Sequence, residues 1–379
     1  MAKPSDYAIL QVLPQLETGG VEQVVVELTE AVARTGARAL VASLPGKLVP
    51  AIERAGGTHI PLDLKSRNPF RMSWNGDQLA KLIKSQRVSL IHAHSRAPAF
   101  AARAASMRRS IPFVTTYHGA YNQTGPLKSR YNAVMAAGDR VIAISTFIAD
   151  LVRARHHIGD DKLRIVPGGV DPARFDPDAI NGGRVERLAR AWRLPDGAPT
   201  IMLPARLTAW KGQQVMIAAL AKLRHRDAIL ILVGSAQGRD AYLKSLSQQA
   251  QSLDVAKRVL FAGDCADMPA AYKLADVVVN ASTDPEAFGR TIVEAQAMRR
   301  LVIATDHGAA KETIRANETG WRVPPNDPAA LAAAIDQALD LPVEARIAIG
   351  AAARDFVATN YAVSTMQAGN LAVYHELLG

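Results

Sequence analysis

The feature that most constrains the fold of this chain is an alternation of short β-branched segments with longer, alanine-rich segments of helical periodicity. Val21–Thr35, for example, is an apolar-periodic segment that ends just before Gly36. Strands and helices that alternate in this way predict a parallel sheet covered on both faces. In the first half of the chain the strand-like runs are Ala8–Val12, Ala39–Ser43, Thr58–Pro61, Leu90–Ala93, Pro112–Tyr117, Arg140–Ala143 and Leu163–Val166.

A cluster of turn-forming residues, Pro167–Pro172 and then Pro177–Gly183, interrupts this alternation and marks the best candidate domain boundary. The alternation then restarts, with strand-like runs at Thr200–Pro204, Ala228–Val233, Arg258–Phe261, Val277–Asn280 and Leu301–Ala304. We therefore predict an α/β protein of two Rossmann-like, doubly wound domains, residues 1–170 and 171–359, with a helix over 360–379 that packs back on the first. Ligands of such sheets bind beyond the carboxyl ends of the strands, so we expect the domains to face each other across a cleft that holds the chemistry.

Composition narrows the class of protein. A chain of 379 residues is long enough for two domains, and 49% hydrophobic with 21% charged residues excludes wholesale disorder. The lone Cys265 cannot form an internal disulfide or a Cys-rich zinc site. Apolar runs such as Val141–Ala149 fall short of the ~20 residues that a membrane-spanning helix needs, and the first residues lack a signal-peptide pattern. We expect a cytoplasmic protein with at most peripheral contact on the inner face of a membrane.

The most informative segment is Asp284–Ala295, which follows a predicted strand and opens a helix near Gly289. Glu286 precedes this helix and Glu294 lies about one turn inside it, so both carboxylates can face one pocket. Main-chain N–H groups at a helix start bind anions, here those of Gly289, Arg290 and Thr291. Two carboxylates around an anion cradle suit a phosphorylated sugar. The alternative is an acidic first turn that only complements the helix dipole.

A second cationic segment, Pro204–Gly212, ends the strand Thr200–Pro204. Arg206 offers a planar fork for phosphate oxygens and Lys211 offers a point charge. Two cations beside an amide cradle would neutralise a diphosphate leaving group as its charge grows. The alternative is that both are ordinary solvated surface cations.

In the first half, Gly19 and Gly20 join the first strand to the first helix and would let the backbone approach a ligand closely. A plain tight turn is the alternative, and the G-x-G-x-x-G spacing of a dinucleotide site is missing. His118 ends the strand Pro112–Tyr117 and therefore points at the same strand-end space, although it could equally be a satisfied loop histidine.

Metal binding is not predicted. His92 and His94 lie two residues apart on a strand and are followed by Arg96, but no third ligand is suggested nearby. Asp176-Pro177-Asp178 has an Asp-x-Asp form, yet it lies in the interdomain turn, where turn chemistry is the better explanation.

Taken together, these motifs resemble the retaining GT-B glycosyltransferases of family 4, also called glycosyl transferases group 1. The resemblance runs from Gly19-Gly20 to the final helix, and its sharpest part is Glu286-x7-Glu294 with Phe288-Gly289 between. His118-Gly119, Val166–Asp171, and Arg206 with Lys211 match in the same order. Departures occur at Arg300-Leu301, where Gly or Pro is common, and in the turn Asp306-His307-Gly308-Ala309-Ala310, where a Gly-Gly pair is common. They leave the donor sugar open.

The resemblance implies a role for each matched residue. Glu286 and His118 would be catalytic, contacting the donor sugar near the reaction centre, and the donor nucleotide would be held by Gly20, Arg206, Lys211, Phe288, Gly289, Arg290, Thr291 and Glu294. Loops on the acceptor side would contribute Gly19, Glu22, His94 and Arg96. Family members retain anomeric configuration without a metal, and a front-face mechanism is favoured in which the leaving phosphate helps to deprotonate the acceptor. We expect no cofactor and a UDP-sugar rather than a GDP-sugar as donor.

The positive charge is concentrated where the resemblance puts the acceptor. Lys and Arg number 45 against 35 Asp and Glu, an excess of 10, and residues 1–170 hold 22 of the basic and only 12 of the acidic side chains. This part could therefore face an anionic acceptor or membrane surface. The basic side chains that we assign to such a surface are Lys81, Lys84, Arg87, Arg103, Arg108 and Arg109, the first three on or just beyond a predicted helix Ser73–Gln86. A solvated face is the alternative; nucleic acid is not expected, because aromatic residues make up only 5%.

We predict a retaining, metal-independent glycosyltransferase that moves a sugar from a nucleoside diphosphate to a membrane-linked anionic glycan or glycolipid. Lipopolysaccharide core or a polysaccharide lipid intermediate fits best as acceptor. Two alternatives stay open: a nucleotide-sugar epimerase or hydrolase on the same scaffold, and a non-enzymatic two-domain sugar-binding protein.

Overall fold

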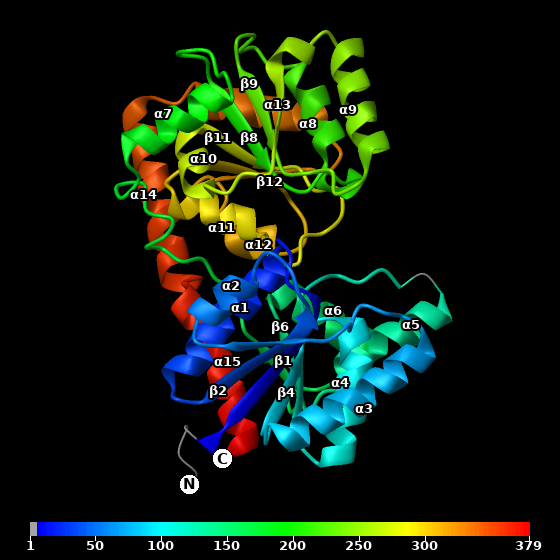
Figure 1. Ribbon diagram of the computed structural model, residues 1–379. Helices are drawn as coiled ribbons and strands as arrows, with labels where there is room; N and C mark the ends of the chain where they lie inside the picture. The colour runs from blue at the N-terminus through cyan, green and yellow to red at the C-terminus, as the bar shows by residue number, and fades with distance from the viewer. Residues whose placement is uncertain (1–5, 124) are drawn as a thin grey trace. The chain divides into compact units, whose positions relative to one another are not determined.

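A computed structural model describes residues 6–123 and 125–379 (Figure 1). The chain forms two compact units. The first comprises the chain through Gly168 together with Val363–Gly379, and the second comprises Gly169–Ala362.

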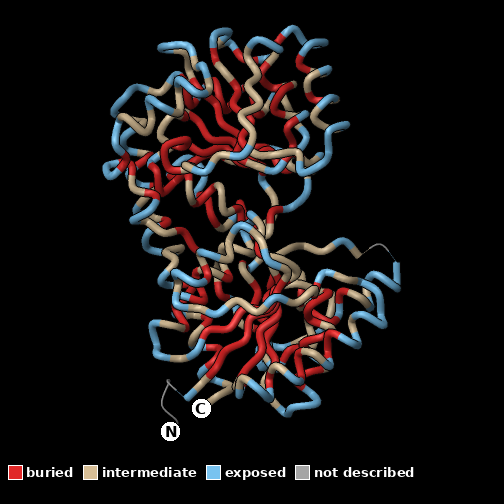
Figure 2. Tube along the Cα trace, in the orientation of Figure 1, coloured by how far each residue is buried: buried red, intermediate tan, exposed pale blue. Residues whose placement is uncertain are grey.

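The first unit is built on a seven-stranded sheet whose strand order is β3-β2-β1-β4-β5-β6-β7, with every neighbouring pair parallel. The central strands are fully buried because helices cover both faces of the sheet, as Figure 2 shows. The strands are β1 (Ala8–Gln15), β2 (Arg38–Leu44), β3 (Thr58–Pro61), β4 (Leu90–Ala93), β5 (Phe113–Tyr117), β6 (Arg140–Ala143) and β7 (Leu163–Ile165).

Helices divide between the two faces of this sheet (Figure 1). On one side lie α1 (Gly20–Arg34), α2 (Val49–Arg54) and the last helix α15 (Val363–Leu378), and on the other lie α3 (Pro69–Ser85), α4 (Arg96–Arg109), α5 (Pro126–Asn132), the 3-10 turn η2 (Ala133–Ala136) and α6 (Thr146–His156). Helix α15 packs against α1, and its Met366, Val373 and Tyr374 join the core with Ile9 and Leu28. The end of the chain is therefore part of the first unit's hydrophobic core.

Helix α3 begins four residues earlier than the predicted Ser73. Asn68 caps it, because its side-chain oxygen accepts hydrogen bonds from the main-chain N–H groups of Phe70 and Arg71. Pro69 occupies the first helical position, where its missing N–H costs nothing. The helix therefore includes Phe70 and Arg71, which the sequence prediction left outside it.

The second unit has a six-stranded parallel sheet with the strand order β10-β9-β8-β11-β12-β13. Its strands are β8 (Thr200–Pro204), β9 (Ile229–Val233), β10 (Val259–Gly263), β11 (Val277–Asn280), β12 (Leu301–Thr305) and β13 (Trp321–Val323). Strand β13 was not predicted, because a three-residue run is too short to show a period.

Helices again pack on both faces of the second sheet, around a core that includes Ile201, Leu230, Val279 and Ile303. They are α7 (Gly182–Ala191), η3 (Ala209–Lys211), α8 (Gln213–Leu220), α9 (Asp240–Ser252), η4 (Ala256–Arg258), α10 (Met268–Leu274), α11 (Arg290–Ala297), α12 (Ala310–Thr313), α13 (Pro328–Leu339) and α14 (Val343–Asn360). None of the helices in the described ranges is both long and apolar enough to cross a membrane.

Both sheets reverse their strand order at one point, between β1 and β4 in the first unit and between β8 and β11 in the second. The connections that leave these two strands run in opposite directions, which opens a crevice at their carboxyl ends where ligands of doubly wound folds bind. The prediction of two doubly wound, Rossmann-like parallel-sheet domains is confirmed. The residues that follow β1, β4, β8 and β11 are therefore the first candidates for a functional site.

Candidate functional site

In the second unit, the two segments that leave the reversal point carry opposite charges. Lys211 follows β8 in the turn η3, and Glu286 follows β11 in the loop before α11. The Lys211 ammonium forms an ion pair with Glu286 Oε1, and both side chains are largely buried. The ammonium also lies 4.0 Å from the centre of the Trp210 ring, a cation–π contact. The fold thus joins two residues that belong to separate motifs in the sequence.

The two oxygens of Glu286 have different surroundings. Oε1 accepts hydrogen bonds from Lys211, from Ser282 Oγ at 2.6 Å and from Asn280 Nδ2 at 3.3 Å. Within the described residues, Oε2 has no hydrogen-bond partner. The carboxylate is therefore held in place through one oxygen while the other can accept hydrogen bonds from a ligand.

Opposing effects set the charge of Glu286. Burial alone would raise the pKa of this carboxyl, but the Lys211 ammonium and the hydrogen bonds from Lys211, Ser282 and Asn280 outweigh it. The pKa of Glu286 consequently lies below its ordinary value, and the group is ionised at neutral pH. An ionised, buried carboxylate accepts strong hydrogen bonds from hydroxyl groups.

Two glycines clamp the loop that carries Glu286. Gly212 has φ +72°, and a Cβ there would overlap the carbonyl oxygen of Ala281. Gly308 has φ +58°, and a Cβ there would overlap the main chain of Glu286, whose carbonyl oxygen accepts a hydrogen bond from Ala309 N–H at 2.9 Å. Both positions need glycine, because the neighbouring backbones approach too closely for a side chain.

Helix α11 starts where the sequence predicted the anion cradle. Gly289 caps it in the left-handed region at φ +83°, a conformation that suits glycine. The side chain of Phe288 is buried edge-on against Tyr361 and so fixes the loop rather than lining its surface. The N–H of Ile292 already bonds to Gly289 O, whereas Arg290 and Thr291 supply the first N–H groups of the helix.

Glu294 and Arg206 do not contact Glu286, although the sequence places all three at strand or helix ends that could share one pocket. The Tyr272 hydroxyl donates to Glu294 Oε2 at 2.9 Å and Arg290 Nε donates to Oε1 at 3.1 Å, so both oxygens of Glu294 are occupied and neither contacts Glu286. Arg206 is exposed, and its carbonyl oxygen accepts a hydrogen bond from the Gln213 side chain.

The first unit's reversal point begins with Gly19 and Gly20, which are both exposed and lead from β1 into α1. Gly19 is extended, with φ 173°, so its backbone conformation does not demand glycine. A Cβ there would meet only the carboxylate end of Glu22, a flexible group in the first turn of α1. This loop is therefore less constrained than the Glu286 loop.

A buried chain of neutral side chains ends at His118. Gln11 on β1 donates through Nε2 to Thr29 Oγ1 and to the Val25 carbonyl, so its Oε1 faces His94 Nε2 at 3.1 Å. His94 Nδ1 lies 3.0 Å from His118 Nε2. Strands β4 and β5 are neighbours, which is why the histidines after them meet.

Hydrogen-bonding logic fixes the protons along this chain. An amide oxygen only accepts, so His94 must carry its proton on Nε2, and its Nδ1 must accept the Nε2 proton of His118. Burial keeps both rings neutral: it lowers the pKa of His94 well below the ordinary value and lowers that of His118 to about 3. His118 Nδ1 is then left as a lone-pair acceptor.

The remaining histidine and arginine of this region have internal partners. His92 Nδ1 lies 2.7 Å from the Tyr374 hydroxyl, and its Nε2 lies 2.7 Å from Thr116 Oγ1. Arg96 donates to Asn132 Oδ1 at 2.8 Å and stacks over Tyr121.

No group of three or more His, Cys, Asp or Glu in residues 6–123 and 125–379 could hold a metal ion. Asp176-Pro177-Asp178 forms a turn closed by Asp178 N–H donating to Asp176 Oδ1 at 3.1 Å. The two carboxylates lie in ion pairs with Arg354 and Arg299 respectively.

The predicted basic surface of the first unit is exposed. Lys81, Lys84 and Arg103 lie on α3 and α4, and Arg87 follows α3. Two of the arginines also have internal partners: Arg108 pairs with Asp77 at 3.1 Å and Arg109 Nε donates to the Ala80 carbonyl.

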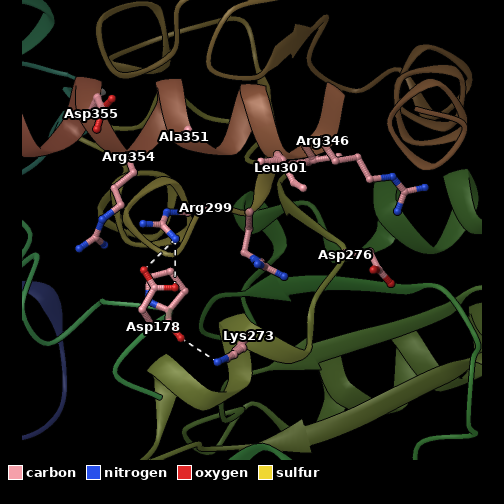
Figure 3. Close-up of a pocket in the computed structure, with 12 residues that line it drawn as sticks. Asp178, Lys273, Asp276, Arg299, Leu301, Arg346, Ala351, Arg354 and Asp355 are labelled. Atoms are coloured by element: carbon pink, nitrogen blue, oxygen red, sulfur yellow. Dashed lines mark hydrogen bonds and ion pairs between the residues drawn. The ribbon is translucent and has the colours of Figure 1, made fainter. Parts of the chain in front are cut away.

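A hollow of about 580 Å³ in the second unit is rich in cations but lies at the wrong edge of the sheet (Figure 3). It is lined at the amino ends of β11 and β12, next to Asp276 and Leu301, whereas Glu286 follows the carboxyl end of β11. Its cations hold the fold together: Arg354 donates to the carbonyls of Phe175 and Ala297, and Lys273 donates to those of Pro177 and Ile180. This hollow is therefore not the candidate site.

Sequence reasoning missed four residues of the two sites: Asn280, Ser282, Tyr272 and Gln11. Asn280 is the polar last residue of an otherwise apolar strand and Ser282 follows two residues later, just before the Glu286 loop, and this signal could have identified them. Tyr272 and Gln11 meet their partners only through tertiary packing.

Comparison with known proteins finds glycosyltransferases along most of the chain. A family model described as Glycosyl transferases group 1 matches residues 185–356, and one described as Glycosyltransferase Family 4 matches residues 18–174. A D-inositol 3-phosphate glycosyltransferase of Salinispora arenicola is 31% identical over 322 residues, which cover 76% of this chain and 68% of that protein.

A GDP-mannose-dependent alpha-(1-6)-phosphatidylinositol monomannoside mannosyltransferase of Mycobacterium tuberculosis is 33% identical over 238 residues. This match covers 59% of the present chain and only 60% of the length of the mycobacterial protein.

Among solved structures, a glycosyltransferase from Rickettsia africae is 35% identical, with a TM-score of 0.90 over 98% of both chains. HepE of Anabaena, crystallised with UDP and glucose, has a TM-score of 0.87 over 98% of this chain and 100% of its own. At 22% identity, the likeness to HepE shows the fold alone.

Proposed function

The chain belongs to the group 1 glycosyl transferases of the GT4 type, which have the GT-B fold, and from this premise we propose that it is a glycosyltransferase. It moves a sugar from a nucleoside diphosphate to a membrane-linked, anionic acceptor. The observation that carries the proposal is the buried, ionised Glu286, held through Oε1 beside Lys211 with Oε2 left for a ligand.

The donor is recognised by charge and by hydrogen bonding. Glu286 Oε2 accepts hydrogen bonds from hydroxyl groups of the donor sugar. The Lys211 ammonium, the exposed Arg206 and the first N–H groups of α11 bind the diphosphate, where negative charge grows as the leaving group departs. Glu294 exchanges its Tyr272 and Arg290 bonds for the ribose hydroxyls. His118 Nδ1, a neutral acceptor, receives a hydrogen bond from a carbohydrate hydroxyl.

The transfer is a retaining, metal-independent substitution. The bond between the anomeric carbon and the diphosphate oxygen breaks, and the acceptor oxygen bonds to the same face of that carbon. The proton of the acceptor hydroxyl passes to the departing phosphate. Glu286 acts by position and charge in this scheme, because a nucleophilic role would need its carboxylate close to the anomeric carbon.

The relatives suggest what the donor and acceptor are. The proposed donor is a UDP-sugar, and GDP-mannose is the alternative favoured by the name of the mycobacterial relative. The names of the mycobacterial and Salinispora relatives refer to phosphatidylinositol and to D-inositol 3-phosphate, and both of these compounds contain a phosphorylated, anionic polyol. A phosphorylated polyol or glycolipid acceptor suits the basic first 170 residues, and lipopolysaccharide core or a polysaccharide lipid intermediate belongs in the same panel.

The test measures sugar transfer by wild type and by Glu286→Ala against panels of donors and acceptors. Asp284→Asn is the matched control, because it removes an exposed carboxylate from the same loop. We expect Glu286→Ala to lose at least about a hundredfold in kcat/KM and Asp284→Asn to stay near wild type. Unimpaired transfer by Glu286→Ala would sink the assignment.

Product analysis separates the rival functions. Anomeric NMR of the product should show retention at the transferred sugar. Donor conversion without an acceptor would indicate an epimerase or hydrolase instead. Binding of free sugar with no binding of any nucleotide would indicate a non-enzymatic sugar-binding protein.

A further inference from the structure

Large apolar side chains are exposed on one flank of the first unit, formed by α3, α4 and α5. Phe70 and Trp74 on α3 are 86% and 53% exposed, and Leu127 at the start of α5 is 85% exposed. Met107 on α4 is 70% exposed. Single exposed apolar side chains are ordinary, but two aromatic residues one helical turn apart on the same exposed helix face are not.

Helix α3 is amphipathic in an unusual way. Its buried face contains Asn75, Leu79 and Ile83, which pack inward. Its exposed face, by the spacing of 3.6 residues per turn, presents Phe70 and Trp74 in the first half and Lys81 and Lys84 in the second. The outer stripe is thus aromatic at one end and basic at the other, instead of polar throughout.

Charge on this flank favours an anionic partner. Its two carboxylates, Asp63 and Asp77, each pair with an arginine, Arg71 at 3.2 Å and Arg108 at 3.1 Å. Within the described residues, Arg67, Lys81 and Lys84 have no carboxylate partner. Net positive charge therefore surrounds the exposed aromatic side chains.

The topology places the apolar side chains at the same edge of the sheet as the candidate acceptor residues. Helices α3 and α5 start after the carboxyl ends of β3 and β5, as α1 and α4 do after β1 and β4. Phe70, Trp74 and Leu127 therefore lie at the sheet edge that also carries Gly19 and His118. Lys81 and Lys84 continue the exposed stripe of Phe70 and Trp74 along α3, whereas Arg87, Arg108 and Arg109 lie at or just beyond the C-terminal ends of their helices, at the other edge.

We propose that Phe70, Trp74 and Leu127 insert into the interface of an anionic lipid bilayer while Arg67, Lys81 and Lys84 bind its headgroups. Tryptophan and phenylalanine favour the membrane interface, and each basic side chain near an anionic surface adds to the attraction. This inference deepens the proposed function, on which it rests, by naming the surface that brings the protein to a membrane-linked acceptor. It also moves the membrane contact away from Arg87, Arg108 and Arg109.

Vesicle flotation with the full chain tests the proposal. The vesicles are pure phosphatidylcholine or phosphatidylcholine with phosphatidylglycerol, and the proteins are wild type, Phe70→Ser/Trp74→Ser and the control Val343→Ser/Ile347→Ser. The control removes two exposed apolar side chains, 65% and 66% exposed, from α14 in the second unit. We expect wild type and control to bind the anionic vesicles at least tenfold more tightly than the Phe70/Trp74 variant does. Equal binding by that variant overturns the proposal.

Two further arms separate charge and self-association from membrane docking. Lys81→Gln/Lys84→Gln should weaken binding to anionic vesicles severalfold and lessen its decrease with salt. Analytical ultracentrifugation checks the main competing occupant, a second copy of the chain. A wild-type dimer that Phe70→Ser/Trp74→Ser abolishes, with no vesicle binding by either protein, overturns the proposal in favour of a dimer interface.

The outcome can be told apart from the proposed function itself. The Phe70/Trp74 variant should transfer sugar to a water-soluble acceptor fragment at the wild-type rate, since neither residue belongs to the donor or acceptor site. If the wild type transfers sugar but does not bind anionic vesicles, the proposed docking surface is wrong and the proposed function stands. A wild type that binds vesicles but turns over no donor disproves the proposed function and leaves the surface standing.

Discussion

The two reversal points of this molecule share a topology and differ in chemistry. Between β8 and β11 an ionised carboxylate and an ammonium are buried together, whereas between β1 and β4 a chain of neutral amide and imidazole groups leads to His118. The first arrangement suits a diphosphate and sugar hydroxyls, and the second suits uncharged hydroxyls. The same strand order thus supplies two crevices, and the residues after the strands decide what each one can bind.

The largest effect on stability and activity should come from removing the cation of the Lys211–Glu286 ion pair. Lys211→Met leaves Glu286 buried without its cation, so we expect the free energy of unfolding to fall by about 3 kcal/mol, as measured by urea denaturation. Transfer activity should fall by at least about a hundredfold. The double variant Lys211→Met/Glu286→Gln should regain most of the stability but none of the activity. Equal stability of the single and double variants would show that the pair is not a buried charge pair.

A glycine substitution in each unit tests the difference in backbone constraint. Gly212→Ala places a Cβ against the Ala281 carbonyl at positive φ, and should destabilise the protein by about 2–3 kcal/mol. Gly19→Ala meets only the mobile end of Glu22 and should cost about 0.5 kcal/mol. Thermal unfolding of the two variants measures both. A greater loss for Gly19→Ala would reverse the comparison.

Acid should weaken the first unit before the second. His92 and His94 are buried and neutral, with pKa values below the ordinary value, that of His92 at about 3. Their stabilising effect is complete above the unfolded pKa near 6.5 and is lost as the pH falls from there towards the folded value, at roughly 1 kcal/mol per histidine per pH unit. Glu286 has a lowered pKa, so its effect is lost only below its unfolded pKa near 4.5.

Hydrogen exchange at pH 7.5 and 5.5, corrected for intrinsic rates, measures this difference. Amides of β4 and β5 should lose protection at pH 5.5, and those of β8 and β11 should keep it. Equal losses in both sheets would mean that the histidines do not set the acid response.

The smallest effect should come from the exposed cation of the donor site. Arg206→Ala removes a phosphate contact without disturbing a buried group, so we expect the donor KM to rise about tenfold with little change in stability. Lys257→Ala removes an exposed positive charge elsewhere in the same unit and serves as the control. If both variants raise KM alike, Arg206 acts only through general charge.

The strands of both units and several site residues that follow them could be predicted from the sequence. Alternating periodicity located every strand except β13, and strand ends located Lys211, Glu286, His94 and His118. These succeed because periodicity and strand-end placement are local properties of the chain.

The pairings were not predictable. Nothing in the spacing shows that Lys211 lies against Glu286, that His94 lies against His118, or that Tyr272 occupies Glu294. Such contacts depend on which strands are neighbours and on side-chain packing. The start of α3 was also missed, because the Asn68 cap outweighs the later onset of periodicity.

The central claim is that Glu286 hydrogen-bonds the sugar hydroxyls of a nucleoside diphosphate sugar, while Lys211 and the start of α11 bind its diphosphate. Calorimetric titration of UDP, GDP and their sugar conjugates into wild type and Glu286→Gln tests it directly. We predict that wild type prefers a sugar conjugate to the bare nucleotide, and that Glu286→Gln loses roughly tenfold of this preference while still binding the bare nucleotide. A wild type that binds no nucleotide, or a variant that keeps the full preference, would contradict the account.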